Sequence, residues 1–588
     1  MWFKLLWPYL KQYKNTWIRM IIMGLLVSGC DAFYPLFNRY AIDHFIGEKT
    51  LDTLPVFLII YMSVGITQCI SNYLNVNDCA KLELYINRDL RNTVFEHLQD
   101  VSLSYYNQNS VGYIHARVMS DSGKIGQMAS WRIMDIVWWG SYILFSIVVM
   151  FVVNMRLALW VVGLLPIAVF CIWLFQNRLL LLNRLIREKN SQITSDINEG
   201  IIGVRSIKGL VIENKMDEKF KRETGEMYRL GVKSGHFGAL FTSTVSLLTG
   251  VVLAMVIWKG GEMTNENIIA IGTFSVFMSY AMGMLDPIQN MIGSITQIIA
   301  VRVNVERYAA IMNVTGEVFD TPKVIEKYGT GFEPKTENWE ELQGDVEFAD
   351  VSFSYPDGDE TVLEHFNLKV SKGSNVAIVG ETGAGKSTLV NLVCRFFEPT
   401  GGDVLIDGKS SRLRSLKWLH SNIGYVLQTP YLFSGSIRDN LTYGKEDLTD
   451  EQIMKALKMI KADEIVTRQK DGLNAFVGEG GDMLSTGEKQ LLSIARALLS
   501  DPKILILDEA TSSIDTVTEK VIQDAIATLI KDRTSFVIAH RLSTILSADM
   551  ILVVSNGKIV ESGTHKELMS KKGEYYSLFT RQYEELIV

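Results

Sequence analysis

The chain has 588 residues, a formal net charge of −7 and 48% hydrophobic residues. This length exceeds what a single hydrophobic core supports, so at least two domains are expected. The acidic net charge leaves no basic footprint for nucleic acid. A mean hydropathy of +0.15 is high for a soluble protein of this size, and the apolar residues are concentrated in the first half.

Apolar stretches long enough to cross a membrane occupy that first half. About 20 apolar residues cross the ~30 Å hydrocarbon core as a helix. Four stretches contain no Asp, Glu, Lys or Arg, and two others are interrupted, one by Asp31 and one by Asp286 and Pro287. We predict a membrane domain over residues 1–312 with six transmembrane helices, at about residues 17–40, 53–77, 132–155, 157–178, 236–258 and 267–301.

Basic residues set the expected orientation of these helices. Lys4, Lys11, Lys14 and Arg19 precede the first span, and further Arg and Lys residues follow the second and fourth spans. By the positive-inside rule these regions are cytoplasmic. The expected protein is therefore a multi-pass protein of the plasma (inner) membrane, with both termini and the second half of the chain in the cytoplasm.

Two cytoplasmic stretches, about residues 78–130 and 178–236, are long and polar for membrane loops. Their apolar residues recur at helical spacing, so we expect the spans to continue as helices into the cytoplasm. Each pair of extensions then turns at a short transverse segment. A polar linker is predicted over residues 313–342, followed by a second domain over residues 343–588.

A phosphate-binding motif lies near the start of this second domain. Residues 380–388 read GETGAGKST, which fits the pattern G-x-x-x-x-G-K-[ST]. A β-branched run precedes the motif and an apolar helical pattern follows it, and a strand, a glycine loop and a helix N-terminus together make an anion site. Lys386 is expected to reach the β- and γ-phosphates of ATP, and the Ser387 hydroxyl is expected to bind Mg²⁺. The predicted phosphate-loop residues are Gly380, Glu381, Thr382, Gly383, Ala384, Gly385, Lys386, Ser387 and Thr388.

Two adjacent carboxylates end a second apolar run. Residues 504–507 read ILIL, and Asp508 and Glu509 follow them. An unpaired carboxylate at the end of a buried strand is costly, and holding Mg²⁺ through water relieves that cost. Asp508 is therefore the predicted metal residue, and Glu509 is the predicted general base for the attacking water.

With these motifs in order, the chain from about Leu342 to its end resembles the nucleotide-binding domain of ABC transporters. The first half resembles the six-span membrane domain of ABC exporters. The resemblance implies an all-α polytopic membrane domain with long cytoplasmic helix extensions. After it comes an α/β P-loop ATPase domain with a helical subdomain. It also implies export driven by ATP hydrolysis, since six spans ahead of one cassette is the exporter order.

The resemblance assigns roles to residues that the spacing alone does not identify. Tyr355, in the sequence FSYP, matches the aromatic residue that stacks on adenine. Gln428 matches the residue that helps to coordinate Mg²⁺ and water. His540 matches the switch histidine that contacts the γ-phosphate, and Asp515 matches the loop that crosses between two cassettes.

The signature sequence departs from the family pattern. Residues 484–488 read LSTGE, where ABC transporters usually read LSGGQ. In the family, two cassettes sandwich two ATP molecules, and the signature of one cassette faces the phosphate loop of the other. Ser485 and Gly487 are kept, but Thr486 adds a β-branched side chain and Glu488 places a carboxylate near a triphosphate. This combination resembles one half of a heterodimeric exporter with one consensus and one degenerate ATP site. A homodimer that tolerates the changes is the alternative.

Further residues are candidates for coupling and for the substrate path. Ser104–Asn107 and Glu199–Lys208 resemble the two intracellular segments that lodge in cassette grooves. Asp31 and Asp286 lie within apolar spans, where carboxylates are costly and are often functional. Met282 lies near Asp286, and flexible thioethers suit a surface that repacks around varied ligands.

The leading hypothesis is ATP-driven export of hydrophobic or amphipathic small molecules, of multidrug type, by alternating access. The expected partners are a second half-transporter, membrane lipids and a hydrophobic small-molecule substrate, and no nucleic acid. A lipid flippase or a peptide exporter is an alternative transport reaction. An ATP-gated regulatory ABC protein is a different class, and an intact catalytic carboxylate argues against it.

Overall fold

The computed structural model describes residues 2–314, 316–356, 358, 360–445, 447–508, 516–539 and 542–583. The chain divides into two compact units. The first comprises Met1–His97 and Gly112–Asn313, and the second comprises Leu98–Val111 and Val314–Val588. The short segment Leu98–Val111 of the first half therefore packs with the second.

The first unit is all helical. Its helices in chain order are α1 (Trp2–Gln12), α2 (Lys14–Tyr40), η1 (Ala41–Gly47), α3 (Leu54–Asp100), α5 (Val111–Ala116), η2 (Arg117–Asp121), α6 (Ser122–Gln127), η3 (Met128–Arg132), α7 (Ile133–Val153), α8 (Met155–Ile202), α9 (Val204–Leu210), α10 (Glu213–Asn265), α11 (Ile271–Gly283) and α12 (Leu285–Met312). In the described part of the chain, five helical stretches are long and apolar enough to cross a membrane: Lys14–Gly47, Leu54–Asp100, Val111–Val153, Met155–Ile202 and Glu213–Asn265.

The region predicted as a sixth span, residues 267–301, forms two helices instead of one. α11 ends at Gly283, and α12 begins at Leu285 on the other side of Met284. Pro287 cannot donate a backbone hydrogen bond, and it disfavours helical geometry in the residue before it. Because of this break, six crossings stay a prediction.

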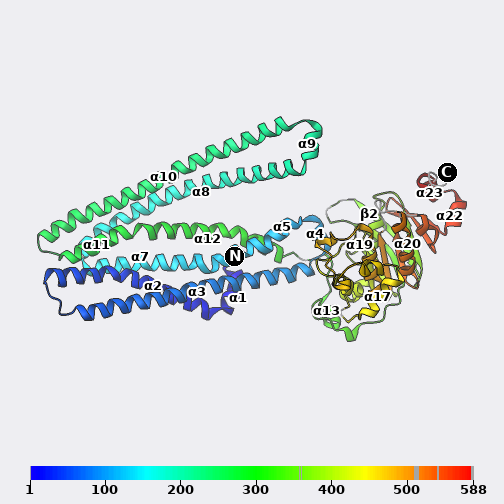
Figure 1. Ribbon diagram of the computed structural model, residues 1–588, viewed down its shortest axis with the longest axis horizontal. Helices are drawn as coiled ribbons and strands as arrows, with labels where there is room; N and C mark the ends of the chain where they lie inside the picture. Colours follow the sequence, from blue (N-terminus) through cyan, green and yellow to red (C-terminus); the bar gives the residue numbers. More distant parts are fainter. Residues whose placement is uncertain are drawn as a thin grey trace. The chain divides into compact units, whose positions relative to one another are not determined.

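Three helices are far longer than a membrane requires. α3, α8 and α10 contain 47, 48 and 53 residues. At 1.5 Å per residue each extends for about 70–80 Å, more than twice the hydrocarbon thickness. Figure 1 shows α8 and α10 side by side, with α9 at the turn that joins them. The prediction that the spans continue as long helical extensions is confirmed.

The turn between α7 and α8 consists of Asn154 alone. Its backbone is extended, and its side-chain oxygen accepts a hydrogen bond of 3.1 Å from the N–H of Leu157. An Asn at this position satisfies one of the free N–H groups of the first helical turn. The third and fourth predicted spans, at about residues 132–155 and 157–178, are therefore joined by a tight turn.

The bundle core lies among α7, α8, α10, α11 and α12. Buried aliphatic and aromatic side chains fill it, including Met150, Val161, Phe277 and Ile288. α2 packs on α7 and α11, and α12 packs on α7. The hydroxyl of the buried Tyr280 in α11 donates to the backbone carbonyl of Ala32 in α2. This bond ties α2 to the second half of the bundle.

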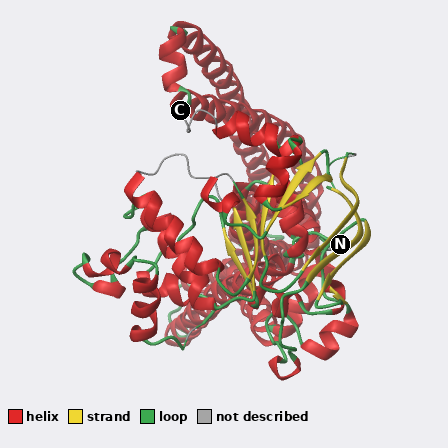
Figure 2. Ribbon diagram, turned by 90° about the vertical axis from the view of Figure 1, so that its right-hand side faces the viewer, coloured by secondary structure: helices red, strands yellow, loops and turns green. Residues whose placement is uncertain are grey.

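The second unit contains two sheets. Its strands are β1 (Val346–Ser354), β2 (Thr361–Val370), β3 (Asn375–Val379), β4 (Gly401–Ile406), β5 (Lys409–Ser410), β6 (Ile423–Val426), β7 (Ile504–Asp508), β8 (Thr534–Ile538), β9 (Met550–Ser555) and β10 (Lys558–Gly563). The antiparallel sheet has the order β2-β1-β4-β5, and the other sheet has the order β10-β9-β3-β8-β7-β6. In the second sheet all pairs are parallel except β10 with β9. Figure 2 shows both sheets in yellow among the helices that cover them.

Helices complete this unit. They are α4 (Leu103–Gln108), α13 (Pro322–Tyr328), η4 (Thr336–Asn338), α14 (Lys386–Val393), η5 (Ser411–Leu413), α15 (Leu416–Ser421), α16 (Ile437–Thr442), α17 (Asp450–Met459), α18 (Asp463–Thr467), η6 (Gly472–Asn474), η7 (Glu479–Gly481), α19 (Thr486–Ser500), α20 (Thr516–Ile530), α21 (Leu542–Leu546), α22 (His565–Lys571) and α23 (Glu574–Tyr583).

Buried side chains of α14 fill the space between the two sheets, and α16–α20 share a second core against the other face of the parallel strands. These features confirm the predicted α/β ATPase fold with a helical subdomain.

Candidate nucleotide site and membrane-domain site

The phosphate loop joins β3 to α14, as its sequence predicts. Every residue of β3 is buried in the centre of the parallel sheet, and α14 begins at Lys386. Gly380, Gly383 and Gly385 have φ angles of 153°, 86° and 103°. These are values that residues with a Cβ rarely adopt. A Cβ on Gly380 would lie 2.2 Å from the carbonyl oxygen of Val554. The backbone of the loop is therefore fixed by its glycines and by the neighbouring strand β9.

Lys386 folds back over this loop. Its Nζ donates hydrogen bonds of 2.8 Å to the carbonyl oxygens of Gly380 and Glu381. Burial lowers the pKa of Lys386, and the nearby carboxylate of Asp508 opposes that shift by raising it. A bound phosphate would offer the ammonium group stronger, charged acceptors in place of the two carbonyl groups. The geometry suits the predicted contact with the β- and γ-phosphates.

Tyr355 is held by the phosphate-loop helix. Its hydroxyl forms a hydrogen bond of 2.9 Å with the Oγ1 atom of Thr388, which is buried in the first turn of α14. The edges of Phe353 and Phe397 pack against the ring at centroid distances of 4.9 and 5.2 Å. Thr388, predicted as a phosphate residue, thus positions the aromatic ring that is predicted to stack on adenine. The sequence gives no local signal for this bond, because 33 residues separate the two side chains.

A cavity of about 500 Å³ opens beside this ring. Tyr355, Val362 and Phe397 of the cassette line it, together with Ser104 and Asn107 of α4. α4 contains Ser104–Asn107, which the sequence predicts as a coupling element, and it belongs to the same compact unit as the cassette. A helix from the first half of the chain therefore lines the predicted adenine site.

Asp508 and Gln428 lie at the same edge of the parallel sheet as the phosphate loop. β3, β8, β7 and β6 run in the same direction, with Ile378 opposite Ile538 and Val426 opposite Leu507. Their carboxyl ends, where ligands bind in open α/β sheets, are therefore neighbours. This edge carries the phosphate loop after β3, Asp508 at the end of β7, and the exposed Gln428 just after β6. Glu509, Asp515 and His540 lie outside the described residues.

The residues present fit a magnesium ion bound together with ATP. Mg²⁺ is usually held by one or two protein oxygens, several waters and the substrate phosphates. Asp508 lies close enough to Lys386 to act on its pKa, and Ser387 is exposed in the first turn of α14. Among the described residues no group of three or more His, Cys, Asp or Glu side chains could hold a metal ion by itself. Ser387 and Asp508 are oxygen donors beside the phosphate loop, a donor set that suits an ion shared with the nucleotide phosphates.

The signature forms the N-terminus of α19. Ser485 is the residue that caps this helix, and Gly487 is buried in its first turn, whereas the side chain of Thr486 is exposed. The Oγ of Ser485 accepts a hydrogen bond from the N–H of Glu488. One carboxylate oxygen of Glu488 accepts bonds from the N–H and the hydroxyl of Ser485, at 2.8 and 2.9 Å. The two residues thus form a reciprocal capping box.

Glu488 also has a partner that the sequence analysis missed. The guanidinium of Arg468 donates to Oε1 of Glu488. Burial raises the pKa of Glu488, but the bonds from Ser485 and the charge of Arg468 outweigh this effect and lower the pKa. Arg468, the residue directly after α18, therefore supplies a positive charge to the carboxylate that the signature sequence introduces.

α9 carries part of the second predicted coupling element, and large apolar side chains at both of its ends are exposed. Ile202, which ends α8 just before it, is 86% exposed, and Leu210 and Val211 at its other end are 70% and 80% exposed. A cluster of large apolar residues in an aqueous region usually marks an interaction surface.

In the membrane unit, Asp31 of α2 has two neutral partners. Its Oδ1 accepts a hydrogen bond of 2.6 Å from Gln68 of α3, and its Oδ2 accepts one of 3.3 Å from the indole of Trp138 in α7. Tyr34 donates to Gln68 at 2.6 Å and completes the network. No Lys, Arg or His among the described residues forms an ion pair with Asp31.

The other two predicted substrate-path residues lie apart from this network. Asp286 is exposed in the first turn of α12, and Met282 is exposed near the end of α11. The structure describes both beside the helix break at Met284. They do not share a hydrogen-bond network with Asp31 in the described part of the chain.

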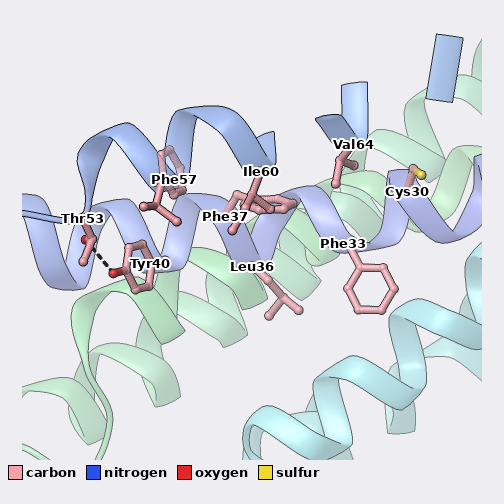
Figure 3. A pocket seen from close by; sticks show the side chains of 10 residues that line it. Cys30, Phe33, Leu36, Phe37, Tyr40, Thr53, Phe57, Ile60 and Val64 are labelled. Carbon is pink, nitrogen blue, oxygen red and sulfur yellow. Dashed lines mark hydrogen bonds between the residues drawn. The ribbon is translucent and has the colours of Figure 1, made fainter. Parts of the chain in front are cut away.

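An apolar cavity of about 550 Å³ lies between α2 and α3 (Figure 3). Phe33, Phe37 and Phe57 are among its aromatic lining residues, and a 2.8 Å hydrogen bond between Tyr40 and Thr53 lies at one end. Cys30 and Val64 lie at the other end, close in sequence to Asp31 and Gln68. Sequence reasoning did not find this cavity, because no single helix contains it.

Comparison with known proteins agrees with this arrangement. Residues 17–288 match the ABC transporter transmembrane region, and residues 363–512 match the ABC transporter family of ATP-binding domains. An ATP-dependent lipid A-core flippase of Desulfotalea psychrophila is 34% identical over 98% of this chain and 97% of its own length. The chain belongs to the ABC transporter family.

Other relatives of this ABC transporter carry export descriptions. The "Putative multidrug export ATP-binding/permease protein YgaD" of Bacillus subtilis is 32% identical over 98% of both chains. A Staphylococcus aureus protein with the same description is also 32% identical, over 98% of both chains. The protein is thus an ABC exporter half-transporter with a membrane domain fused to one ATPase domain, as its sequence predicts.

Proposed function

We propose that this exporter moves hydrophobic or amphipathic small molecules out across the plasma membrane by alternating access. The proposal rests most on one observation: Lys386 and Asp508 lie together at the ligand-binding edge of the cassette sheet, in a chain that also carries long apolar helices. The names of two relatives favour multidrug export over the alternatives. Both termini and the cassette are placed in the cytoplasm on the basis of the positive-inside rule.

The proposed ATP site uses the residues of the sheet edge. Lys386 and the loop N–H groups bind the phosphates, and Tyr355 stacks on adenine. Ser387, Gln428 and Asp508 hold Mg²⁺, the last through water. The ion would neutralise charge that develops on the transferred phosphoryl group. Glu509 activates the attacking water, and His540 orders water and base beside the γ-phosphate.

A second half-transporter completes the proposed assembly. The exposed apolar residues around α9 support a partner, because exposure of such side chains in water is unfavourable. Thr486 in the signature supports a heterodimer in which this chain contributes to one degenerate site. Arg468 pairs with Glu488, so the charge of Glu488 is a weaker reason to expect a degenerate site. The β-branched side chain of Thr486 is then the main feature of the signature that would impair ATP binding. A homodimer is the second candidate.

The substrate path is proposed to include Asp31, Asp286 and Met282. An intramembrane carboxylate that lacks a basic partner favours a ligand with positive charge. The neighbouring cavity between α2 and α3 offers an apolar, aromatic surface of a size suited to small molecules. Lipid movement is the alternative, and the name of the flippase relative is the observation that favours it.

ATP-dependent transport of ethidium into inside-out proteoliposomes tests the proposal. We expect uptake that requires ATP and is lost in Glu509→Gln, because this variant retains nucleotide but lacks the general base. Movement of a fluorescent phospholipid with no ethidium uptake would favour the flippase. ATP hydrolysis with neither transport reaction would contradict small-molecule export.

The charge of Asp31 is tested by Asp31→Asn, with Asp286→Asn as the companion variant. Each is expected to raise the KM for the cation ethidium by about three- to tenfold, which is the size expected for loss of one partly shielded charge pair. The KM for the neutral dye Nile red is the control and should not change. An equal change for both dyes would show that Asp31 maintains structure and does not recognise charge.

A further inference from the structure

Arg468 connects two helices of the cassette through the signature. It directly follows α18, 20 residues before Glu488, and its guanidinium pairs with Oε1 of that carboxylate. The other carboxylate oxygen accepts the N–H and the hydroxyl of Ser485. Both oxygens of Glu488 are therefore engaged, one by a cation and one by the residue that caps α19.

In an ATP sandwich the signature faces the triphosphate of the nucleotide, so the charge of Glu488 affects nucleotide binding. The first-turn N–H groups of a helix attract anions. A carboxylate in the same turn repels a triphosphate, and the repulsion grows as water is excluded. Arg468 adds one positive charge in direct contact with that carboxylate, so the pair carries no net charge.

We propose that Arg468 is a positioning residue for the signature. It neutralises Glu488 and holds the carboxylate against Ser485, so the free N–H groups of Thr486 and Gly487 can bind a γ-phosphate without repulsion. The inference rests on the proposed function, since it requires ATP between a phosphate loop and a signature. It explains how an acidic residue is tolerated where the family usually has glutamine.

If Arg468 served only to stabilise the fold, its loss would lower the melting temperature. The side chain of Arg468 is 66% exposed and that of Glu488 is 19% exposed, and exposed ion pairs add little to folding stability. Gln at position 488 can keep the capping geometry, because either Glu or Gln can occupy this position of a capping box. Loss of Arg468 should therefore affect nucleotide binding and leave the melting temperature unchanged.

The test uses the full-length chain with Glu509→Gln, which blocks hydrolysis, at two copies per lipid nanodisc. The readout is the ATP concentration that gives half-maximal occlusion of radiolabelled ATP. Arg468→Gln is expected to raise this concentration by about three- to tenfold, since it leaves one uncompensated charge near the triphosphate. In a Glu488→Gln background, Arg468→Gln should not weaken occlusion. Arg468→Lys should keep this ATP concentration close to that of the parent chain, because Lys retains the positive charge.

Salt and a matched ion pair provide the controls. The effect of Arg468→Gln should shrink at 1 M salt, where the Debye length falls to about 3 Å. Lys461→Gln removes an exposed cation from the same subdomain, paired with Asp524 at 2.8 Å, and should leave occlusion unchanged. An equal effect of Arg468→Gln in both backgrounds, or no effect in either, would overturn the inference. If the parent chain occludes no ATP, the sandwich itself fails, and the inference fails with it.

Discussion

The phosphate loop and the signature lie in one cassette, but backbone conformation determines the shape of the loop and side-chain contacts determine the shape of the signature. The loop depends on backbone: Gly380 and Gly385 have positive φ angles, and the carbonyl oxygen of Val554 leaves no room for a Cβ on Gly380. The signature depends on side chains, because Ser485, Glu488 and Arg468 satisfy one another. A backbone-determined site tolerates almost no substitution, whereas a site made by side chains can exchange one charge for another. This difference accounts for an intact loop beside an altered signature.

The largest expected effect is that of Gly380→Ala. The new Cβ would meet the Val554 carbonyl oxygen at 2.2 Å, and the φ of 153° is strained for alanine. We expect ATP affinity to fall by at least about 100-fold and the melting temperature to drop, since the loop and β9 must separate. Nucleotide binding and thermal unfolding of the purified chain measure both.

Gly373→Ala is the matched control for Gly380→Ala. Gly373 also has a positive φ, of 77°, but a Cβ there meets no atom within 4 Å. Gly373→Ala should lower the free energy of unfolding by about 1 kcal/mol and leave ATP affinity unchanged. Equal losses from the two variants would show that backbone strain alone, and not close packing, determines the loop.

Thr486 gives the next largest effect. A side chain at this exposed position of α19 keeps the helix N-terminus away from a phosphate, so smaller residues should allow closer approach. In two-copy nanodiscs, turnover should rise in the order Thr, Ala, Gly, by about three- to tenfold overall. No increase, or a decrease at Gly, would show that the signature does not limit the reaction.

The smallest effect concerns the bond between Tyr355 and Thr388. Thr388→Val and Tyr355→Phe each remove one hydrogen bond, worth about 1 kcal/mol. The KM for ATP should rise about two- to fivefold in either variant. The double variant should be no worse than the singles, because both remove the same bond. Additive losses would mean that the hydroxyl groups act on the nucleotide separately.

Much of this architecture could be predicted from the sequence, because local patterns encode it. The runs ILIL and GETGAGKST place a strand end and a phosphate loop, and the uncharged apolar stretches place the long helices. These features depend on neighbouring residues, so a single sequence is enough to find them. The stretch at residues 267–301 is predicted as one span despite Asp286 and Pro287, and the separation of α11 from α12 beside them is not predicted.

The remaining features depend on contacts between distant segments. Arg468 reaches Glu488 across 20 residues, and the network of Asp31 joins three helices. α4 reaches the cavity beside Tyr355 from the first half of the chain. No spacing rule relates such positions, since tertiary packing alone brings them together.

The ATPase activity of this chain purified alone in lipid, with its oligomeric mass measured on the same sample, is the most direct test of the proposed heterodimer. We expect little or no turnover by the chain alone, and recovery when a related half-transporter with an intact signature is co-expressed. The recovered activity should be lost in Glu509→Gln. Brisk turnover by a dimer of this chain alone would contradict the heterodimer and show that the altered signature supports hydrolysis.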